Sequence, residues 1–474
     1  MFKRFGRWYR QLKSGKPEVV PARQAGEDEH WDIVTDVAVV GFGGAGAAAA
    51  LEARAEGAQV AAIDRFNGGG STKISGGIYY AGGGTSIQDE AGIEDSPDNM
   101  CNYLVQETGD AVGRDTLRQF CQDSPANLAW LQDQGVPFQA SLCPFKTSYP
   151  SNDYYLYYSG NESFPPYSDT ATPAPRGHRA PGRGVSGAAL FGPLQNAAIE
   201  AGVEVLSQHR ATGLITGPQG EVLGVQLTRM QPGSLSRWLH RWLYSLMIYL
   251  RYGAMYVPLI NWVLRAWLES LERHFGQQLS LRARRGVIIS SGGFFYNRDM
   301  VEEYARDFMP GMPLGTIGDD GSGILLGESV GGRLGHMHNV SQWRFINPPE
   351  SFVRGVMIDH KGRRVCNEML YGAQMAEQIM EKSGGHAWLI IDAGLRKQAL
   401  REIGPSRAMW FQSATALVYL FLARKKAPTL EQLAVKLDIP AADLVATIRQ
   451  YNRAQLDGLD DPMGKPADHR ALLE

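Results

Sequence analysis

Cysteine is scarce in this sequence. The 474 residues include only four cysteines, and no C-x-x-C or C-x-x-C-H pattern is present. Their wide spacing argues against a structural zinc site, an attached haem and a disulfide-stapled scaffold. We therefore expect no metal site and a reducing, cytoplasmic location. The cysteines are Cys101, Cys121, Cys143 and Cys366.

A surplus of charge of either sign is also missing. The formal net charge is −2, which gives no reason to expect nucleic acid as a partner. No apolar run of the secretory type follows the basic N-terminal residues, so a signal peptide is not expected. At 474 residues the chain is nevertheless long enough to bury a large core and to contain more than one domain.

Even the most apolar segment, residues 235–275, lacks an uncharged run long enough to cross a bilayer. Its longest uncharged part, Tyr252 to Leu264, contains Pro258 and has thirteen residues, whereas a spanning helix needs about 20. Aromatic and aliphatic residues interleave with arginines there, as in helices that lie in a membrane interface. A helical hairpin buried in an oligomer contact is the alternative.

Residues 1–16 have a similar character. They contain six Lys and Arg, no acid and several interleaved aromatic residues. As a helix they would form a membrane-surface element, and otherwise they would be a disordered basic tail. Together, residues 1–16 and 235–275 predict a peripheral contact with the inner face of a membrane.

The segment from Val37 to Asp64 carries the strongest pattern in the chain. It reads as a strand, a glycine turn, a helix, a second strand and a terminal acid. Gly41, Gly43 and Gly46 have the G-x-G-x-x-G spacing. In such a unit the first glycine permits the tight turn, the second lets the backbone approach a pyrophosphate, and the third lets helix and strand pack closely.

The helix start and the acid agree with this interpretation. A phosphate would lie at the helix N-terminus around Gly44 and Ala45, where amide protons lack intrahelical partners. Asp64 ends the second strand, where a carboxylate can accept hydrogen bonds from ribose hydroxyls. Because strand, helix, second strand and acid all fit, the pattern favours dinucleotide binding over a turn that binds nothing.

A second glycine-rich stretch follows Asp64. Gly68 to Gly70, with Ser71 and Thr72, offer backbone amides and hydroxyls for another anionic contact. Slightly later, the small residues would let the chain pass close to a flat ring. These are Ser75, Gly76 and Gly77.

These motifs resemble those of a known flavoprotein superfamily. VVGFGGAG, the acid Asp64, GGGSTKISGG and the later GVIISSGGFFYN together are similar to fumarate reductases, succinate dehydrogenase flavoprotein subunits and 3-ketosteroid dehydrogenases. The resemblance implies an α/β fold: a Rossmann-type, glutathione-reductase-like FAD-binding domain with an inserted α+β substrate (cap) domain. It also implies FAD rather than NAD as the cofactor.

The resemblance further implies which residues bind FAD. The adenosine end belongs at the first glycine motif, the adenine passes the main chain at Ala211, and the isoalloxazine lies near Gly76 and Gly77. The predicted cofactor-binding residues are Gly41, Gly43, Gly44, Ala45, Gly46, Asp64, Arg65, Gly70, Ser71, Thr72, Ser75, Gly76, Gly77, Ala211, Ser291, Gly292, Gly293 and Asp320.

The catalytic residues are expected after His336. The segment IDHKGRRVCNE resembles the family's G-x-R-F-x-N-E signature, after which fumarate reductases carry an arginine that clamps a carboxylate. Here Asn367 and Glu368 are followed by Met369, Leu370 and Tyr371, with no arginine. A small acid as substrate would need an arginine from elsewhere, with Arg344 or Arg354 as candidates.

Ketosteroid dehydrogenases use a tyrosine in this neighbourhood, so the resemblance makes Tyr371 the predicted catalytic residue. A phenol acts as a base only where its phenolate is stabilised. Tyr80, just beyond the ring-facing glycines, is the second candidate and would line the substrate site. Either tyrosine could instead serve packing alone.

The implied reaction introduces a double bond into ring A of a 3-ketosteroid, at C4-C5 or at C1-C2. The ketone acidifies the neighbouring carbon, a base removes that proton, and hydride leaves for flavin N5. The substrate partner would be small, apolar and steroid-like, and the electron acceptor is not identified. A reductase of an unsaturated acid and a membrane-associated module with little activity are the alternatives.

The sequence predicts five parts. They are a basic tail and linker at 1–31, a first FAD-binding part at 32–139, an irregular Tyr- and Pro-rich loop at 140–185, a second FAD-binding part at 186–325 with an apolar insertion at 231–279, and a substrate domain with C-terminal helices at 326–474. Family members continue beyond the point that matches Glu474, with a turn that wraps the flavin. We therefore expect a partly open FAD site and low turnover for this chain.

Overall fold

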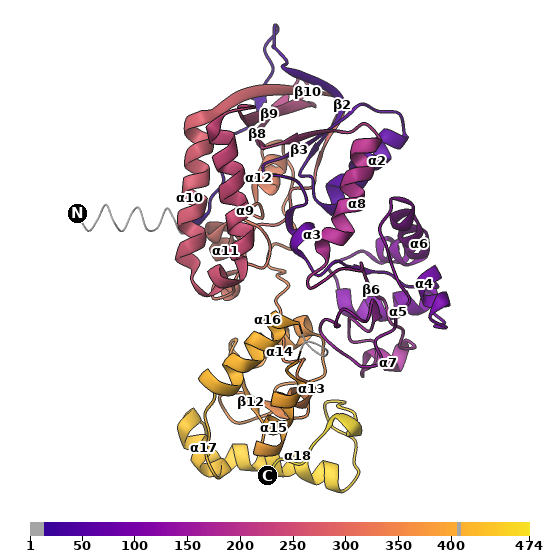
Figure 1. Ribbon diagram of the computed structural model, residues 1–474, viewed down its shortest axis with the longest axis vertical. Coiled ribbons are helices and arrows are strands. Elements are labelled where there is room, and N and C mark those ends of the chain that lie inside the picture. The colour runs from indigo at the N-terminus through magenta and orange to yellow at the C-terminus, as the bar shows by residue number, and fades with distance from the viewer. Residues whose placement is uncertain (1–13, 405–408) are drawn as a thin grey trace, which may run out of the picture. The chain divides into compact units, whose positions relative to one another are not determined.

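The computed structural model describes residues 14–404 and 409–474 (Figure 1). The chain divides into two compact units. Unit 1 contains the residues up to Gly77, Asp133–Pro137 and Val185–Val340, and unit 2 contains Ile78–Gln132, Phe138–Gly184 and Ser341–Glu474. Most of the predicted basic segment 1–16 lies outside the described residues.

A seven-stranded mixed sheet forms the centre of unit 1. Its strand order is β1-β8-β9-β10-β2-β3-β7, with β10, β2, β3 and β7 parallel to one another. Short apolar runs rich in Val, Ile and Ala favour these strands, and all five residues of β3 are buried. The strands are β1 (Arg23–Gln24), β2 (Ile33–Val40), β3 (Val60–Asp64), β7 (Glu204–Ser207), β8 (His209–Thr216), β9 (Val222–Met230) and β10 (Gly276–Ile289).

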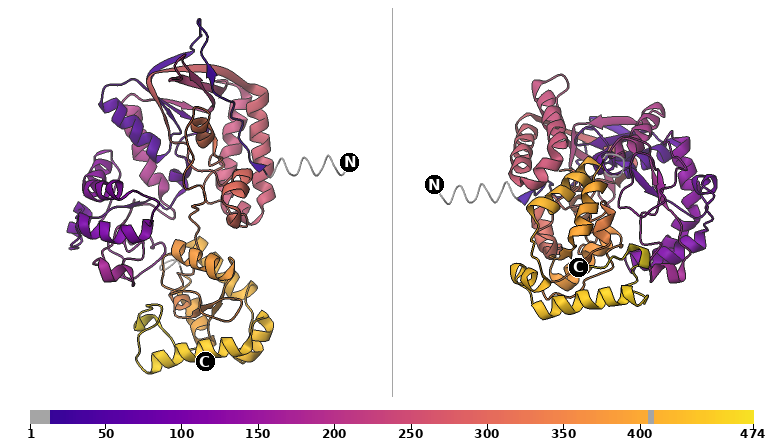
Figure 2. Two further views of the ribbon diagram at one scale, coloured as in Figure 1. Left: turned by 180° about the vertical axis from the view of Figure 1, so that it is seen from behind. Right: turned by 60° about the horizontal axis from the view of Figure 1, so that its bottom comes forward.

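The predicted strand, glycine turn, helix and second strand are confirmed. Helix α2 (Gly44–Ala55) connects β2 to β3 and packs beside α8 (Gly187–Glu200). Its small residues allow this close approach, because Ala47 and Ala50 are completely buried. The two helices lie side by side in Figures 1 and 2. The crossover places the start of α2 at the carboxyl end of β2.

The apolar segment 235–275 forms a helical hairpin inserted between the antiparallel strands β9 and β10. The helices are α9 (Leu235–Tyr256), capped by Ser234, and α10 (Pro258–Phe275), which has Pro258 in its first turn. They run alongside each other in every view (Figures 1 and 2). Among the described residues, no helix combines the length and the hydropathy that crossing a bilayer requires.

Three short helices complete unit 1. They are α3 (Gly70–Ile74), α11 (Arg298–Tyr304) with the 3-10 turn Arg306–Phe308, and α12 (Ser322–Glu328). Helix α3 occupies the GGGST stretch, for which the sequence predicted only exposed amides and hydroxyls. Because α3 follows β3 directly, its residues are held beside the start of α2.

Unit 2 combines a three-stranded sheet, a two-stranded sheet and many helices. The larger sheet has the order β4-β6-β5, with strands Ile78–Tyr80, Gly177–Arg179 and Leu156–Tyr157, and the smaller pairs β11 (Val356–Ile358) with β12 (Trp388–Ile390). The helices are α4 (Ser86–Glu90), α5 (Pro97–Thr108), α6 (Arg114–Asp133), α7 (Tyr167–Thr170), α13 (Glu350–Val353), α14 (Gly372–Ser383), α15 (Ala393–Glu402), α16 (Trp410–Leu417), the π-helix Val418–Leu422, α17 (Leu430–Leu437), α18 (Ala441–Leu456) and the 3-10 turn Ala467–His469.

The units group the chain differently from the predicted domains. Residues 78–132 and 138–139 were assigned to the FAD-binding part but cluster with unit 2. The irregular segment 140–185 supplies two of the three strands of a small sheet. Strands β4, β5 and β6 have only two or three residues each. So short a stretch cannot show the alternation of apolar and polar residues by which a strand is predicted from sequence.

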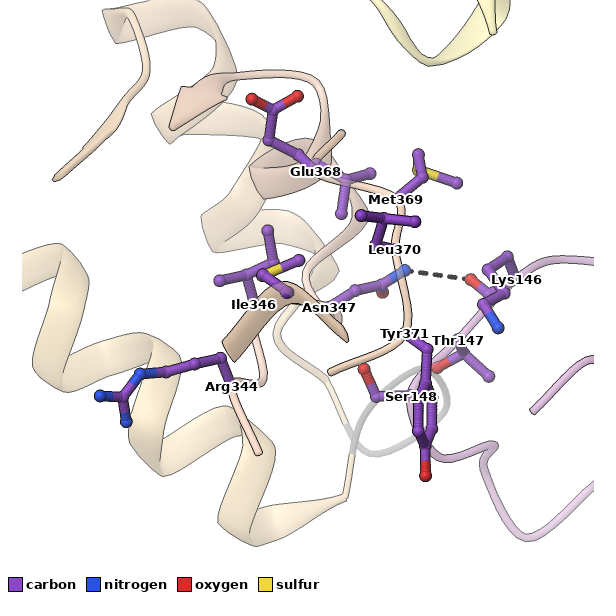
Figure 3. A pocket seen from close by; sticks show the side chains of 12 residues that line it. Lys146, Thr147, Ser148, Arg344, Ile346, Asn347, Glu368, Met369, Leu370 and Tyr371 are labelled. Atoms are coloured by element: carbon purple, nitrogen blue, oxygen red, sulfur yellow. Dashed lines mark hydrogen bonds between the residues drawn. The ribbon is translucent and has the colours of Figure 1, made fainter. Parts of the chain in front are cut away.

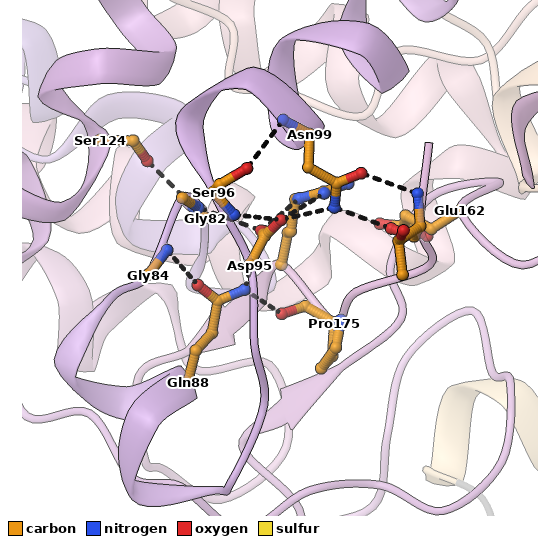
Figure 4. Close-up of polar contacts among 12 residues, drawn as sticks. Gly82, Gly84, Gln88, Asp95, Ser96, Asn99, Ser124, Glu162 and Pro175 are labelled. Carbon is orange, nitrogen blue, oxygen red and sulfur yellow. Dashed lines mark hydrogen bonds and ion pairs between the residues drawn. The ribbon is translucent and has the colours of Figure 1, made fainter. Parts of the chain in front are cut away.

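A buried ion pair holds this sheet to the neighbouring helices. The Asp95 carboxylate accepts hydrogen bonds from Arg176 Nε and Nη2, each at 2.8 Å, and from Asn99 Nδ2 at 2.8 Å (Figure 4). Both charged side chains are fully shielded from solvent. Burial opposes ionisation, but the hydrogen bonds and the charge of Arg176 prevail and lower the pKa of Asp95.

Asp95→Asn tests this pair. We expect it to lower the free energy of unfolding by about 3–5 kcal/mol at pH 7, because the Arg176 guanidinium would stay buried without its counter-charge. Urea denaturation followed by circular dichroism measures the loss. The difference from wild type should shrink as the pH falls from about 4, the usual pKa of an unfolded Asp, through the lower pKa of folded Asp95, below which the wild-type carboxyl is protonated too. Asp123→Asn, an exposed position on α6, should change stability little.

Candidate active site

The glycine turn after β2 is built by close backbone contacts. Gly41 has φ +99°, a conformation that side chains with a Cβ rarely adopt. A Cβ at Gly46 would lie 1.9 Å from the carbonyl oxygen of Gly41. Gly43 caps α2, and Gly44 N donates to Thr72 Oγ1 at 3.0 Å. The N-terminus of α2, with Ala45 in its first turn, therefore adjoins the hydroxyl of α3.

Asp64 lies at the carboxyl end of β3 and is buried. Its carboxylate accepts from the main-chain nitrogens of Phe42 at 3.2 Å, Phe66 at 2.8 Å and Gly68 at 3.2 Å. Burial raises the pKa of Asp64, while the three N–H groups oppose that rise. A carboxylate has about four lone-pair sites. One acceptor site thus remains available, which suits a ribose hydroxyl.

The end of β10 lies next to this turn, because Ile289 pairs with Val40 in parallel register. Ser290 Oγ donates to Gly41 O at 2.8 Å. The Ser291 hydroxyl is buried and has no hydrogen-bond partner among the described residues. Gly292 has φ +82° and Gly293 follows it. The predicted Ser-Gly-Gly segment is therefore brought beside the glycine turn, with an unsatisfied hydroxyl.

The hydroxyl of Ser71 contacts an acid that was not among the predicted residues. Ser71 Oγ donates to Asp319 Oδ2 at 2.5 Å and accepts from Thr316 N at 3.1 Å. Burial raises the pKa of Asp319. Asp320, the acid predicted to bind the cofactor, accepts from Arg65 Nη1 at 3.0 Å.

The remaining predicted cofactor residues lie at three other places in unit 1. Gly77 N donates to Ser75 Oγ at 3.1 Å, and Ser186 Oγ donates to Gly76 O at 3.1 Å. Ala211 is a buried residue of β8 and pairs with β9. Gly70, with φ +46°, begins α3.

These features fit a dinucleotide. Glycines where a Cβ would clash, a helix N-terminus with adjoining hydroxyls, and a buried acid with one acceptor site free are what a pyrophosphate and ribose require. The unpartnered Ser291 hydroxyl adds a polar group that a bound ligand would satisfy. FAD would be held by the glycine turn, Asp64, Thr72 and the Ser291–Gly293 segment.

Both predicted catalytic tyrosines belong to unit 2. Tyr371 caps α14, and its main-chain nitrogen donates to Asn161 Oδ1 at 2.6 Å. Asn161 is completely buried and donates through Nδ2 to Glu107 at 2.8 Å and through its main chain to Tyr103 Oη at 2.8 Å. Tyr371 is thus anchored to α5 through one amide side chain.

Tyr80 connects to the same region through a buried acid. Its hydroxyl donates to Glu162 Oε1 at 3.3 Å, and Gly160 N donates to Glu162 Oε2 at 2.9 Å. Lys146 Nζ donates to the carbonyls of Tyr158 and Gly160 and lies 6.0 Å from the centre of the Tyr371 ring.

Burial controls the protonation of this cluster. Burial, with smaller effects from Glu107 and Glu162, raises the pKa of Tyr371 above its usual value. Burial and then Glu162 raise the pKa of Tyr80 well above it. Burial also lowers the pKa of Lys146 and raises that of Glu162. Both phenols are therefore neutral hydrogen-bond donors at neutral pH.

A small cavity adjoins Tyr371 (Figure 3). Lys146, Asn347, Met369 and Leu370 line it, and Asn347 Nδ2 donates to Lys146 O at 3.0 Å. Its volume of about 10 Å³ admits at most one water. The cavity suits a bound water beside the phenol rather than a substrate ring.

The sequence analysis missed several polar residues of this cluster, of which Asn161 and Glu162 are buried. Glu107, Lys146, Asn161 and Glu162 lie in polar or irregular stretches, where a buried amide or acid looks the same as a solvated one. Only the structure, through their burial and their hydrogen-bond partners, distinguishes these residues from solvated ones.

Comparisons with known proteins agree with this geometry. A family model described as an FAD binding domain matches residues 36–472. The chain belongs to this FAD-binding family. The predicted cofactor, FAD, is thereby confirmed.

Family members of known activity resemble the chain over most of its length. It is 37% identical over 451 residues to a 3-oxo-5-alpha-steroid 4-dehydrogenase of Comamonas testosteroni, a match covering 94% of this chain and 83% of that protein. It is 24% identical to a 3-oxosteroid 1-dehydrogenase of Mycolicibacterium smegmatis, covering 90% and 79%. The crystal structure of 3-ketosteroid-delta4-(5alpha)-dehydrogenase from Rhodococcus jostii RHA1 with 4-androstene-3,17-dione is 27% identical, with a TM-score of 0.78 and coverage of 96% and 84%.

Gly46→Val should abolish flavin binding, because the new side chain would enter the space of the Gly41 carbonyl and displace the start of α2. The ratio of flavin to protein absorbance in purified protein measures this. Gly192→Ala, on α8 where a Cβ meets no atom within 4 Å, should keep the wild-type ratio. Equal flavin content in both variants would contradict the assignment.

Proposed function

We propose that this protein is an FAD-dependent oxidoreductase that introduces a double bond into ring A of a 3-ketosteroid, at C4-C5 in preference to C1-C2. The observation that carries the proposal is the 37% identity to a 3-oxo-5-alpha-steroid 4-dehydrogenase over 94% of the chain. Unit 2 takes the part of the substrate (cap) domain, since it contains Tyr371 and Tyr80. The resemblance to a structure that contains a steroid dione supports an apolar substrate.

In this proposal, residues of the chain transfer a proton next to the ketone of the substrate. A 3-keto group acidifies the neighbouring carbon, and a phenolate at that position would take its proton, whereas a neutral phenol would accept it only while passing its own proton to a base. Tyr371 fits this role because Asn161 fixes its main chain and the adjoining cavity has room for a water. Bound FAD supplies the hydride acceptor. The burial that raises the pKa of Tyr371 also excludes bulk water while charge develops.

The contacts of the N-E signature argue against a small dicarboxylic acid as substrate. Glu368 is completely buried and accepts from Arg364 at 2.7 Å and Lys465 at 3.0 Å, so it serves the packing of unit 2. The Arg344 guanidinium, a candidate carboxylate clamp, points away from Lys146 and Tyr371 in Figure 3. It approaches Gly385 O at 3.4 Å instead.

Anaerobic mixing with a 5α-reduced 3-ketosteroid should bleach the flavin absorbance of the purified protein. Tyr371→Phe should slow the bleaching by about 100-fold or more, because general acid–base groups contribute roughly 10²–10⁴. The wild-type rate should rise with pH from 7 towards 10, since the pKa of Tyr371 is raised and the phenolate fraction grows with pH. Tyr419→Phe, at an exposed position, is the control.

A steroid panel and fumarate distinguish the alternatives in the same assay. Bleaching by 5α-reduced steroids before their 4-ene counterparts supports C4-C5 over C1-C2. Re-oxidation of the dithionite-reduced flavin by fumarate, without any bleaching by steroids, would contradict the proposal.

We also propose that the α9–α10 hairpin contacts the surface of an anionic membrane. Its outer face carries Trp238, Trp242 and Tyr249 at helical spacing, with 59%, 48% and 82% of their surfaces exposed. Trp267 on α10 is 60% exposed. Aromatic rings of this kind suit the membrane interface, and an apolar substrate partitions there.

The charges of the hairpin suit the same partner. Arg241 is exposed, and the exposed Arg273 pairs with Glu18, outside the hairpin, at 2.7 Å. Glu272 is buried, and Glu269 pairs with Arg265 at 3.6 Å. The exposed charge is therefore basic, which attracts anionic headgroups. The six basic residues of segment 1–16 add to this attraction.

Co-sedimentation with phosphatidylglycerol vesicles tests the membrane contact. We expect binding that weakens with salt and falls severalfold in the double variant Trp238→Ser, Trp242→Ser, because apolar surface and charge both contribute. Trp410→Ser, which removes a tryptophan that is 61% exposed in unit 2, should bind as wild type. Failure of the wild-type protein to sediment with vesicles would refute the contact.

A further inference from the structure

The inner face of the hairpin carries a buried carboxylate with several charged partners. Glu272, in the last turn of α10, is 4% exposed. It accepts from Arg65 Nε at 2.8 Å and Nη2 at 2.9 Å, and from Arg210 Nη1 at 3.1 Å. His240 Nε2, from α9, lies 3.0 Å from Glu272 Oε1. One acid of the insertion therefore joins two strands of the sheet and the other helix of the hairpin.

The strand partners of Glu272 adjoin residues of the cofactor site. Arg65 directly follows Asp64 at the end of β3, and Arg210 directly precedes Ala211 in β8. The remaining donor contact of Arg65 is with Asp320, at 3.0 Å. Glu272 thus fixes the backbone on both sides of the site where the ribose and adenine belong.

This arrangement holds the guanidinium of Arg65 in place. Arg65 is almost fully buried, and its guanidinium is held between Glu272 and Asp320. Without the charge of Glu272, two buried guanidiniums would lose their main counter-ion. Arg65 directly follows Asp64, so a shift of Arg65 would also shift the end of β3 and the carboxylate whose remaining acceptor site suits a ribose hydroxyl.

Helix α9 makes a second contact at the same end of the site. The Tyr244 ring stacks on Phe66, with ring centres 4.0 Å apart and an interplanar angle of 2°. Phe66 N donates to Asp64. Tyr244 is 7% exposed, and the Thr316 side chain opposes the rise in the pKa of its phenol that burial causes. The main chain of Thr316 contacts Ser71. The phenol therefore lies among residues of the cofactor site, although it comes from the insertion.

We propose that the α9–α10 hairpin is a part of the FAD site, in which Glu272 and Tyr244 are positioning residues for the adenosine end of the cofactor. Glu272 holds Arg65 and Arg210, and Tyr244 holds Phe66, so that Asp64 and Ala211 keep the geometry that accepts the nucleotide. The inference concerns FAD binding, so it can fail or succeed independently of steroid turnover.

Flavin titration of the apoprotein tests the role of Glu272. Apoprotein of the full chain is prepared by removing FAD, and the quenching of FAD fluorescence gives the dissociation constant. Glu272→Gln, which keeps shape and removes charge, should raise that constant at least tenfold. Glu302→Gln, at an exposed position on α11 where it pairs with Arg306 at 3.6 Å, should leave it unchanged.

Tyr244→Phe provides a conservative second variant, because it keeps the stack on Phe66 and removes the hydroxyl. We expect its FAD dissociation constant to rise severalfold while the melting temperature of the apoprotein stays at the wild-type value. Tyr249→Phe, at the exposed position on the same helix, should bind FAD as wild type.

Two outcomes would overturn the proposal. One is wild-type FAD affinity in the folded fraction of both Glu272→Gln and Tyr244→Phe. The other is a lowered apoprotein melting temperature in Glu272→Gln together with unchanged FAD affinity, which would make the hairpin contact purely structural. If Glu272→Gln does not fold, the result for Tyr244→Phe decides alone.

Discussion

The close approach of Gly46 to the Gly41 carbonyl is the constraint on which unit 1 depends. A Cβ at Gly46 would come within 1.9 Å of that oxygen, so only glycine lets α2 begin directly at the end of β2. This contact brings the helix N-terminus to the carboxyl edge of the parallel strands, where Asp64 and the Ser291–Gly293 segment also end. The nucleotide site follows from this edge, since three chain segments deliver their polar groups to one place.

Regular periodicity explains what could be predicted from the sequence. The strand, turn, helix and second strand of the glycine motif and the helices of segment 235–275 have apolar residues at the spacing of their element. The small sheet of β4, β5 and β6 could not be predicted, because two or three residues are too few to show a period. Helix α3 was missed for a related reason: glycine favours turns, and only the contact with Gly44 supports a helix there.

The candidate site could be predicted where a residue acts through its main chain or its place in a motif, as with Gly41 or Asp64. It could not be predicted where a residue acts through burial. Asn161 lies in a polar loop sequence, yet it is completely buried and fixes Tyr371. Glu272 ends an apolar helix in which an acid would ordinarily face solvent. Because each of them is buried, the loss of its hydrogen bonds would cost free energy that a solvated side chain would not lose.

Two kinds of buried carboxylate occur in the part of the chain that the structure describes, and they differ in the donors that surround them. Glu272 and Asp95 are each surrounded by guanidinium donors, which lower their pKa values despite burial and keep them charged. Such acids are fixed and can only position their neighbours. Glu162, by contrast, has no arginine at hydrogen-bond distance within the described residues, and burial raises its pKa. An acid of this second kind is held less firmly in its ionised form, which is a property of groups that take part in proton transfer. The acid beside Tyr80 in unit 2 therefore supports the proposed proton transfer, whereas the clamp of Arg65 by Glu272 in unit 1 supports rigid cofactor binding.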